Sequence, residues 1–113
     1  MNHRFKAVFL LVTFIVMPSA NAGQQDYQGK IIKMYAYAQY GGGDIQINVT
    51  NPPAKCAGGF WLSPDDAGFD STLSFLLSGY HAKTKFQLTG DDTHLWGGSG
   101  TPYCRLVAVG YVQ

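Results

Sequence analysis

Aromatic and polar side chains gather around two glycine-rich stretches of the chain, residues 41–43 and 97–100. Flat aromatic faces beside carboxylate and amide groups suit sugars, because the faces of a sugar ring are apolar and its hydroxyls need directional partners. The residues that we expect to contact such a ligand are Tyr40, Asp44, Gln46, Asn48, Trp61, His94, Trp96 and Tyr103. The alternative is that Trp61 and Trp96 fill the ends of a small barrel.

Few residues of this chain could form a catalytic site. A serine triad would need Ser63 or Ser99, His94, and Asp91 or Asp92. No G-x-S-x-G signature accompanies either serine, so we predict no catalytic residue and no enzyme. A small hydrolase is the least favoured alternative.

One short segment has the ligand types of a metal site. Residues 91–94, Asp-Asp-Thr-His, offer oxygen and nitrogen ligands close together. A turn whose aspartates bond to their own backbone explains the same residues better. Asp65, Asp66 and Asp70 lack the spacing of a calcium loop. We therefore expect neither a metal nor a cofactor.

The first 22 residues have the pattern of a secretory signal peptide. Arg4 and Lys6 precede an apolar run over residues 7–17, and Ala20-Asn21-Ala22 provides a small-x-small cleavage site. The run is shorter than the roughly 20 residues that span a bilayer, and no second such run follows. We expect a periplasmic or secreted protein that starts at Gly23 and keeps no membrane span.

Size, cysteines and charge narrow the class of protein further. Residues 23–113 are enough for one domain, and export predicts that Cys56 and Cys104 form a disulfide. Such a bond would stabilise the fold by roughly 4 kcal/mol in the chain-entropy model. The same segment has six lysines and arginines against seven aspartates and no glutamate. This balance lacks the basic face of a nucleic-acid-binding protein.

Hydrophobic periodicity predicts three strands before a single helix. Residues 23–28 look like a polar leader. The strand over 29–40 has Ile32, Met34, Ala36 and Ala38 on its buried side and Lys33, Tyr35, Tyr37 and Gln39 outside. It forms a hairpin with residues 44–50, where Ile45, Ile47 and Val49 point inward. A third strand covers 56–62, with a bulge or close backbone approach at Gly58-Gly59.

The second half of the chain predicts the helix and two more strands. Asp70 or Ser71 is a suitable N-cap for a helix that buries Leu73, Leu76, Leu77 and Tyr80. A strand over 83–89 with Thr84, Phe86 and Leu88 inward ends at Gly90-Asp91-Asp92, and a glycine-rich loop leads to an apolar strand over 104–112.

The resulting order, β-β-β-α-β-β, predicts a mainly β fold. A five-stranded antiparallel barrel of the OB type has its helix between the third and fourth strands, as here. In that fold, the loops after the first and fourth strands flank a binding face on the second and third. The predicted ligand residues would meet there. Another small α+β sheet is the alternative.

With these elements in place, the chain resembles small exported bacterial proteins related to the B subunits of subtilase-type toxins. The resemblance covers most of residues 29–112. It rests on the N-terminal strand pair, a cysteine on each side of the helix, and the segment from Leu73 to Leu88. It implies an OB-type fold, a ring of five subunits, and glycan binding that delivers a catalytic partner. It assigns no individual sugar-binding residue.

These observations favour an exported, non-enzymatic binding module that recognises a glycan or a protein. An inhibitor or accessory protein that binds a periplasmic enzyme through the glycine-rich loop containing Trp96 is the alternative. A homo-oligomer could form through the outward Tyr35 and Tyr37 or through open sheet edges.

Overall fold

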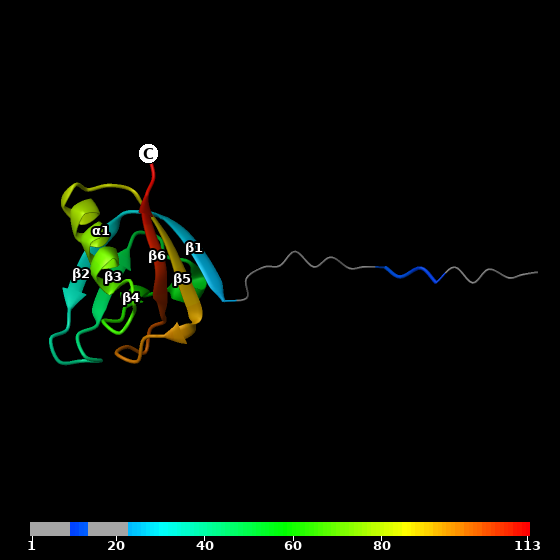
Figure 1. The fold of residues 1–113 in the computed structure, drawn as a ribbon, viewed down its shortest axis with the longest axis horizontal. Helices are drawn as coiled ribbons and strands as arrows, with labels where there is room; N and C mark the ends of the chain where they lie inside the picture. The colour runs from blue at the N-terminus through cyan, green and yellow to red at the C-terminus, as the bar shows by residue number, and fades with distance from the viewer. Residues whose placement is uncertain (1–9, 14–22) are drawn as a thin grey trace, which may run out of the picture.

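The described part of the chain folds into one six-stranded mixed sheet and one α-helix (Figure 1). The computed structural model describes residues 10–13 and 23–113, so most of the predicted signal peptide lies outside the described residues. Within these ranges, no helix is long and apolar enough to cross a membrane. The elements are β1 (Gln24–Gly29), β2 (Ile31–Ala36), β3 (Ile45–Val49), the 3-10 turn η1 (Ala54–Cys56), β4 (Gly59–Leu62), α1 (Phe69–His81), β5 (Phe86–Leu95) and β6 (Tyr103–Tyr111).

The strands lie in the order β1-β5-β6-β4-β3-β2. All neighbours are antiparallel except β4 and β6, which run parallel. The mainly β prediction is confirmed. The prediction of a closed, five-stranded antiparallel barrel is wrong, because there are six strands, one pair is parallel and no ladder joins β1 to β2. Only Lys30 separates these two edge strands, so the sheet curves until its edges approach each other there.

The predicted polar leader is instead strand β1. Each of its residues is in register with β5, from Gln24 opposite Asp91 to Gly29 opposite Phe86. Tyr27 is its one buried side chain, and the Tyr27 hydroxyl donates to the carbonyl of Thr50. Backbone pairing with a distant strand, together with this anchor, therefore orders a segment whose other side chains are polar.

The hairpin of β2 and β3 forms as predicted, with a shorter first strand. Ile45, Ile47 and Val49 are buried on β3, and Met34 packs against the core from β2. Ile32, which was expected to be buried, is 59% exposed. A bulge between Ile31 and Lys33 shifts the register and turns Ile31 inward in its place.

Helix α1 begins at Phe69, after Gly68, so neither Asp70 nor Ser71 is its N-cap. Leu76 and Gly79 are its buried residues, whereas Leu77 is 45% and Tyr80 38% exposed, unlike the predicted face. The buried face of the helix differs from the predicted one because Gly79 faces the sheet. A Cβ at Gly79 would lie 2.3 Å from the ring of Phe86, so only glycine allows this close approach. The helix thus packs closely on β5 through a residue that has no side chain.

Strands β5 and β6 frame the second half of the sheet. Phe86 and Leu88 are buried as predicted, but β5 continues past residues 90–92 to Leu95. Its register with β6 shifts between Asp91 and Leu95, and this irregularity takes the place of the predicted strand end. β6 occupies nearly the predicted range, and residues 96–102 form the expected loop.

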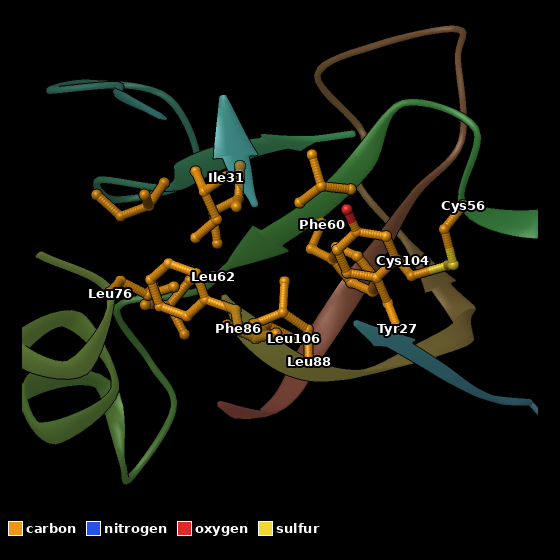
Figure 2. Close-up of a cluster of buried hydrophobic side chains, with 13 residues drawn as sticks. Tyr27, Ile31, Cys56, Phe60, Leu62, Leu76, Phe86, Leu88, Cys104 and Leu106 are labelled. Atoms are coloured by element: carbon orange, nitrogen blue, oxygen red, sulfur yellow. A yellow bond between two sulfur atoms is a disulfide. The ribbon is translucent and has the colours of Figure 1, made fainter. Parts of the chain in front are cut away.

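The core runs from Leu76 of α1 to the Cys56–Cys104 disulfide at its other side (Figure 2). The disulfide confirms the predicted pairing and links η1 to β6, across 48 residues of sequence. It lies beside Phe60 and Tyr27, so the covalent link and the aromatic part of the core support each other.

Gly59 is expected to tolerate no side chain. Its φ is +126°, and a Cβ would lie 2.1 Å from the backbone oxygen of Ile47. Gly59→Ala should lower the free energy of unfolding by about 3 kcal/mol, because it adds a backbone clash to a conformation that L-residues avoid. Urea denaturation measures this loss. Gly110→Ala is the control, since nothing lies within 4 Å of a Cβ there. Equal stability of the two variants would contradict the expectation that Gly59 tolerates no side chain.

Candidate functional site

The loops that follow β2 and β5 meet at one end of the sheet (Figure 1). The indole N–H of Trp96 donates to Oδ2 of Asp44 over 2.9 Å. The rings of Tyr40 and Tyr103 contact the Trp96 ring edge-on, at centroid distances of 5.7 and 5.5 Å. The sequence-based prediction that these four residues come together is correct.

The amides of β3 form a second layer of contacts against Tyr103. Gln46 and Asn48 each donate from the side-chain amide to the Tyr103 hydroxyl, Asn48 over 3.0 Å. Asn48 also donates to the carbonyl of Gly58 at 3.0 Å, and the Tyr37 hydroxyl donates to the Gln46 side-chain oxygen at 2.8 Å. These bonds satisfy the polar groups of the cluster within the protein.

Burial changes the part that this cluster can play. Trp96 is 5% and Asp44 4% exposed, and Gln46 and Tyr103 are also buried. Tyr40 is the large exposed member, at 45%. The tryptophan face expected to stack on a sugar is therefore covered, and the cluster mainly holds the two loops to the sheet. A direct ligand contact by its members remains a prediction.

Trp61 and His94 belong to a different group of side chains. Trp61 on β4 is in register with Gln46 on one side and Arg105 on the other, and Arg105 is in register with Asp91. The Trp61 indole donates to the carbonyl of His94 at 2.9 Å, and the Arg105 guanidinium lies 5.4 Å from the Trp61 ring centroid. Arg105 also forms an ion pair with Asp66 in the loop before α1.

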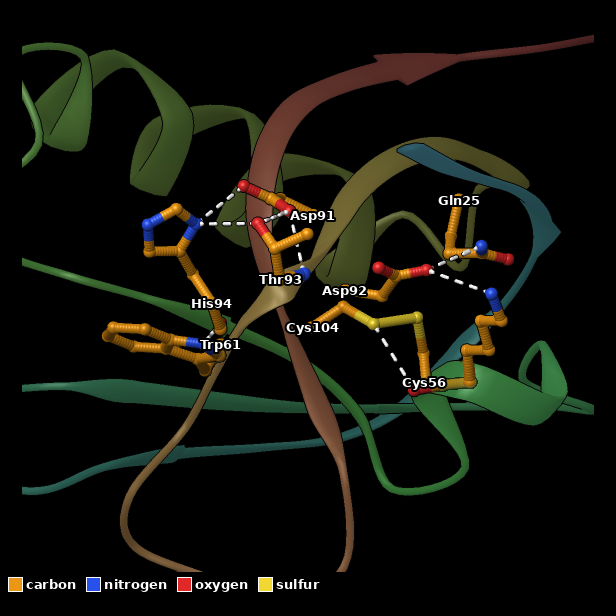
Figure 3. Close-up of a disulfide and its surroundings, with 9 residues drawn as sticks. Gln25, Cys56, Trp61, Asp91, Asp92, Thr93, His94 and Cys104 are labelled. Atoms are coloured by element: carbon orange, nitrogen blue, oxygen red, sulfur yellow. Dashed lines mark hydrogen bonds and ion pairs between the residues drawn. A yellow bond between two sulfur atoms is a disulfide. The ribbon is translucent and has the colours of Figure 1, made fainter. Parts of the chain in front are cut away.

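Asp91 fixes the orientation of His94 (Figure 3). His94 Nδ1 lies 2.7 Å from Asp91 Oδ2, while the backbone N–H and the hydroxyl of Thr93 donate to Asp91 Oδ1 at 2.8 and 2.6 Å. These two Thr93 bonds, with a smaller contribution from His94, lower the pKa of Asp91 from 3.8 to about 2. The aspartate bonds to its own turn, as the turn interpretation predicts.

The histidine and aspartate of a triad are thus paired, but the serines serve other contacts. Ser63 Oγ accepts from the backbone of Asp65, and Ser99 Oγ accepts from that of Thr101. Among the hydrogen bonds of the described residues, none joins a serine to His94 or uses its Nε2. Those residues also contain no group of three or more metal-ligand side chains.

A pocket of about 390 Å³ opens beside these side chains, and we call it the Arg105 pocket. Its polar lining is formed by Asp66, Asp91, His94, Arg105 and Thr72, and its apolar lining by Leu62, Leu106, Val107 and Gly68. Asp66 Oδ2 is buried and has no hydrogen-bond partner among the described residues. The pocket therefore combines a guanidinium, an imidazole nitrogen and an unsatisfied acceptor.

Sequence analysis missed Arg105 and Asp66 as site residues. Arg105 is the only arginine after residue 22, and it interrupts an apolar strand. A charged side chain in such a strand needs a partner, which was the available signal. As a site residue, Asp66 was considered only as a calcium ligand, and its pairing across 39 residues of sequence leaves no local pattern.

Comparison with known protein families, with curated proteins and with solved structures finds no match.

Removing the Trp96 indole N–H should destabilise the fold. Trp96→Phe leaves the buried Asp44 carboxylate without this donor, and we expect the free energy of unfolding to fall by about 2 kcal/mol. Trp61→Phe is the matched control, because the carbonyl it leaves is partly exposed to water. Urea denaturation should show less-than-additive losses in Asp44→Ala/Trp96→Phe. Equal losses in the two Trp→Phe variants would contradict the role of this bond.

Asp91 should make stability depend on acid pH. Its folded pKa is lowered to about 2, so its stabilising contribution is complete above pH 4 and is lost as the pH falls toward 2. Asp91→Asn should flatten this part of the stability profile. Thr93→Val should move the pKa back toward 3.8, because it removes the hydroxyl donor. Carboxyl NMR titration measures both effects, and an Asp91 that titrates near 3.8 in the unmodified protein would refute them.

Proposed function

We propose that this protein is an exported, non-enzymatic binding module that recognises a glycan in the Arg105 pocket. The observation that carries the proposal is the pocket itself, where Asp66 offers a buried oxygen without a partner. Buried polar groups in proteins are almost always satisfied, and a sugar hydroxyl in the pocket would donate to this one after a rotation of the Asp66 side chain, which is itself 24% exposed. At about 390 Å³, the pocket is within the roughly 300–1,000 Å³ of small-molecule sites.

The side chains around the pocket match the two needs of sugar recognition. Arg105 and His94 supply donors and acceptors in fixed orientations, because Asp66 and Asp91 hold them. The half-buried ring of Trp61 lies beside them. Its indole N–H donates to the backbone carbonyl of His94, and the Arg105 guanidinium covers part of its face. Groups fixed before binding lose less conformational freedom when the ligand arrives.

The topology supports a ligand-binding role for the sheet. We interpret residues 24–36 as one bent strand, whose halves β1 and β2 pair with β5 and β3. The sheet then has the connectivity of an OB fold, a partly open Greek-key barrel that binds oligosaccharides on its second and third strands, here β3 and β4. The Arg105 pocket adjoins that face at Leu62 of β4 and extends from there over β5, β6 and the start of α1. The proposal also includes the resemblance to toxin B subunits, which implies that five copies of the protein form a ring.

Export is the remaining part of the proposal. The Cys56–Cys104 disulfide is of the kind that persists in oxidising compartments, and it supports a periplasmic or secreted location. The signal-peptide pattern of residues 1–22 points the same way.

A second candidate, binding to an enzyme as an inhibitor, is favoured by the loop at residues 97–101. All five residues are exposed, while Trp96 and Tyr103, which flank the loop, are buried. An exposed segment on a fixed base can insert into a partner's cleft with little ordering cost.

The oxidised protein should bind a glycan on an array, and variants of His94 in the pocket and of Trp61 beside it should lose that binding. We expect Trp61→Ala and His94→Ala each to weaken the best hit at least about tenfold, or roughly 1.4 kcal/mol. His94 is largely exposed, so its removal should leave the fold intact. Leu77→Ala is the control, because Leu77 is an exposed apolar residue of α1 that lines neither this pocket nor another described one.

Two results would overturn the proposal. One is the absence of any glycan signal together with one stable protein partner in a periplasmic extract, particularly if changes in residues 97–101 abolish that partnership. The other is glycan binding that survives both pocket changes.

A further inference from the structure

A second pocket, of about 440 Å³, lies between the last turn of α1 and the start of β2. Ile31, Phe86 and Gly79 are buried in its lining, and Ile32 and Tyr80 add exposed apolar surface. The bulge that turns Ile32 outward places this side chain beside the helix end. The floor of the pocket is therefore apolar, although the pocket opens to solvent.

The lining residues of this pocket carry charge of one sign. Lys30, His81 and Lys83 line it, and none of its lining residues is acidic. Within the described part of the chain, neither lysine takes part in an ion pair. An apolar floor under unpaired cations complements a ligand that has an apolar body and an anionic head.

Lys83 occupies a backbone position that normally favours glycine. Its φ is +54°, and the N–H groups of Lys83 and Thr84 close the helix by donating to the carbonyls of Tyr80 and Gly79. This is the Schellman end of a helix, where glycine avoids the strain of the left-handed conformation. A lysine here costs stability that a glycine would not, while it adds a cation to the pocket lining.

We propose that this pocket binds a single-chain amphipathic carboxylate, a free fatty acid, with its chain on Ile31, Ile32 and Tyr80 and its carboxylate between Lys30 and Lys83. The volume suits a small molecule rather than a segment of a macromolecule. The charge decides the head group, since a lysine ammonium attracts a carboxylate and repels a cationic head of the same chain length. This site is separate from the Arg105 pocket, because no residue lines both.

Isothermal titration with decanoate tests the proposal on the oxidised protein. Decanoate should bind, and decyltrimethylammonium, with an equal chain and a positive head, should bind at least about tenfold more weakly. Lys30→Met and Lys83→Met should each weaken decanoate binding about tenfold. Lys85→Met is the matched control, because Lys85 is exposed two residues from Lys83 and does not line the pocket.

Lys83→Gly separates binding from a merely structural role. It relieves the left-handed strain, so the helix end should be at least as stable while decanoate affinity still falls. NMR shift changes caused by decanoate should cluster at residues 30–32 and 79–84. The proposal is overturned if both amphiphiles bind equally or if the shifts lie elsewhere. It is also overturned if only vesicles with anionic lipids bind, because the surface would then contact a membrane.

Discussion

The hydrogen bond from the Trp96 indole to the Asp44 carboxylate is the contact on which the candidate site depends. It joins the loop after β2 to the loop after β5, two segments 52 residues apart in the sequence. Burying a carboxylate this deeply costs free energy unless a donor satisfies it. The aromatic packing around Asp44 therefore depends on this hydrogen bond. Tyr103 and the amides of Gln46 and Asn48 extend the same cluster onto the sheet.

The cluster and the Arg105 pocket differ in how their polar groups are satisfied. The cluster satisfies its own, whereas Asp66, with one unsatisfied oxygen, and His94, whose Nε2 makes no hydrogen bond among the described residues, both line the Arg105 pocket. Trp61 connects the two regions, since it is in register with Gln46 of the cluster and lies under the Arg105 guanidinium of the pocket. The fold therefore separates a part that holds the loops from the part in which we propose that a ligand binds.

Local sequence patterns predicted the strands in which buried and exposed side chains alternate. They failed where a strand is ordered by backbone pairing with a segment far away in the sequence. The alternation of Ile45, Ile47 and Val49 and the two cysteines were sufficient to predict β3 and the disulfide. Strand β1 has Tyr27 as its one buried side chain and owes its order to pairing with β5, which no local pattern records. The meeting of Trp96 with Asp44 was predictable from an assumed topology. Their burial was not, because it depends on the rings of Tyr37, Tyr40 and Tyr103 that pack around Trp96.

The two tryptophans allow the central claim to be tested in one experiment, a ¹H–¹⁵N NMR titration that follows both indole N–H signals. The account predicts that the Trp96 signal, buried and bonded to Asp44, exchanges with solvent at least about a hundredfold more slowly than the Trp61 signal. It also predicts that a glycan ligand shifts the Trp61 signal and leaves that of Trp96 nearly unchanged. A Trp96 indole that exchanges rapidly and shifts with ligand would contradict it, because Trp96 would then be an open contact surface.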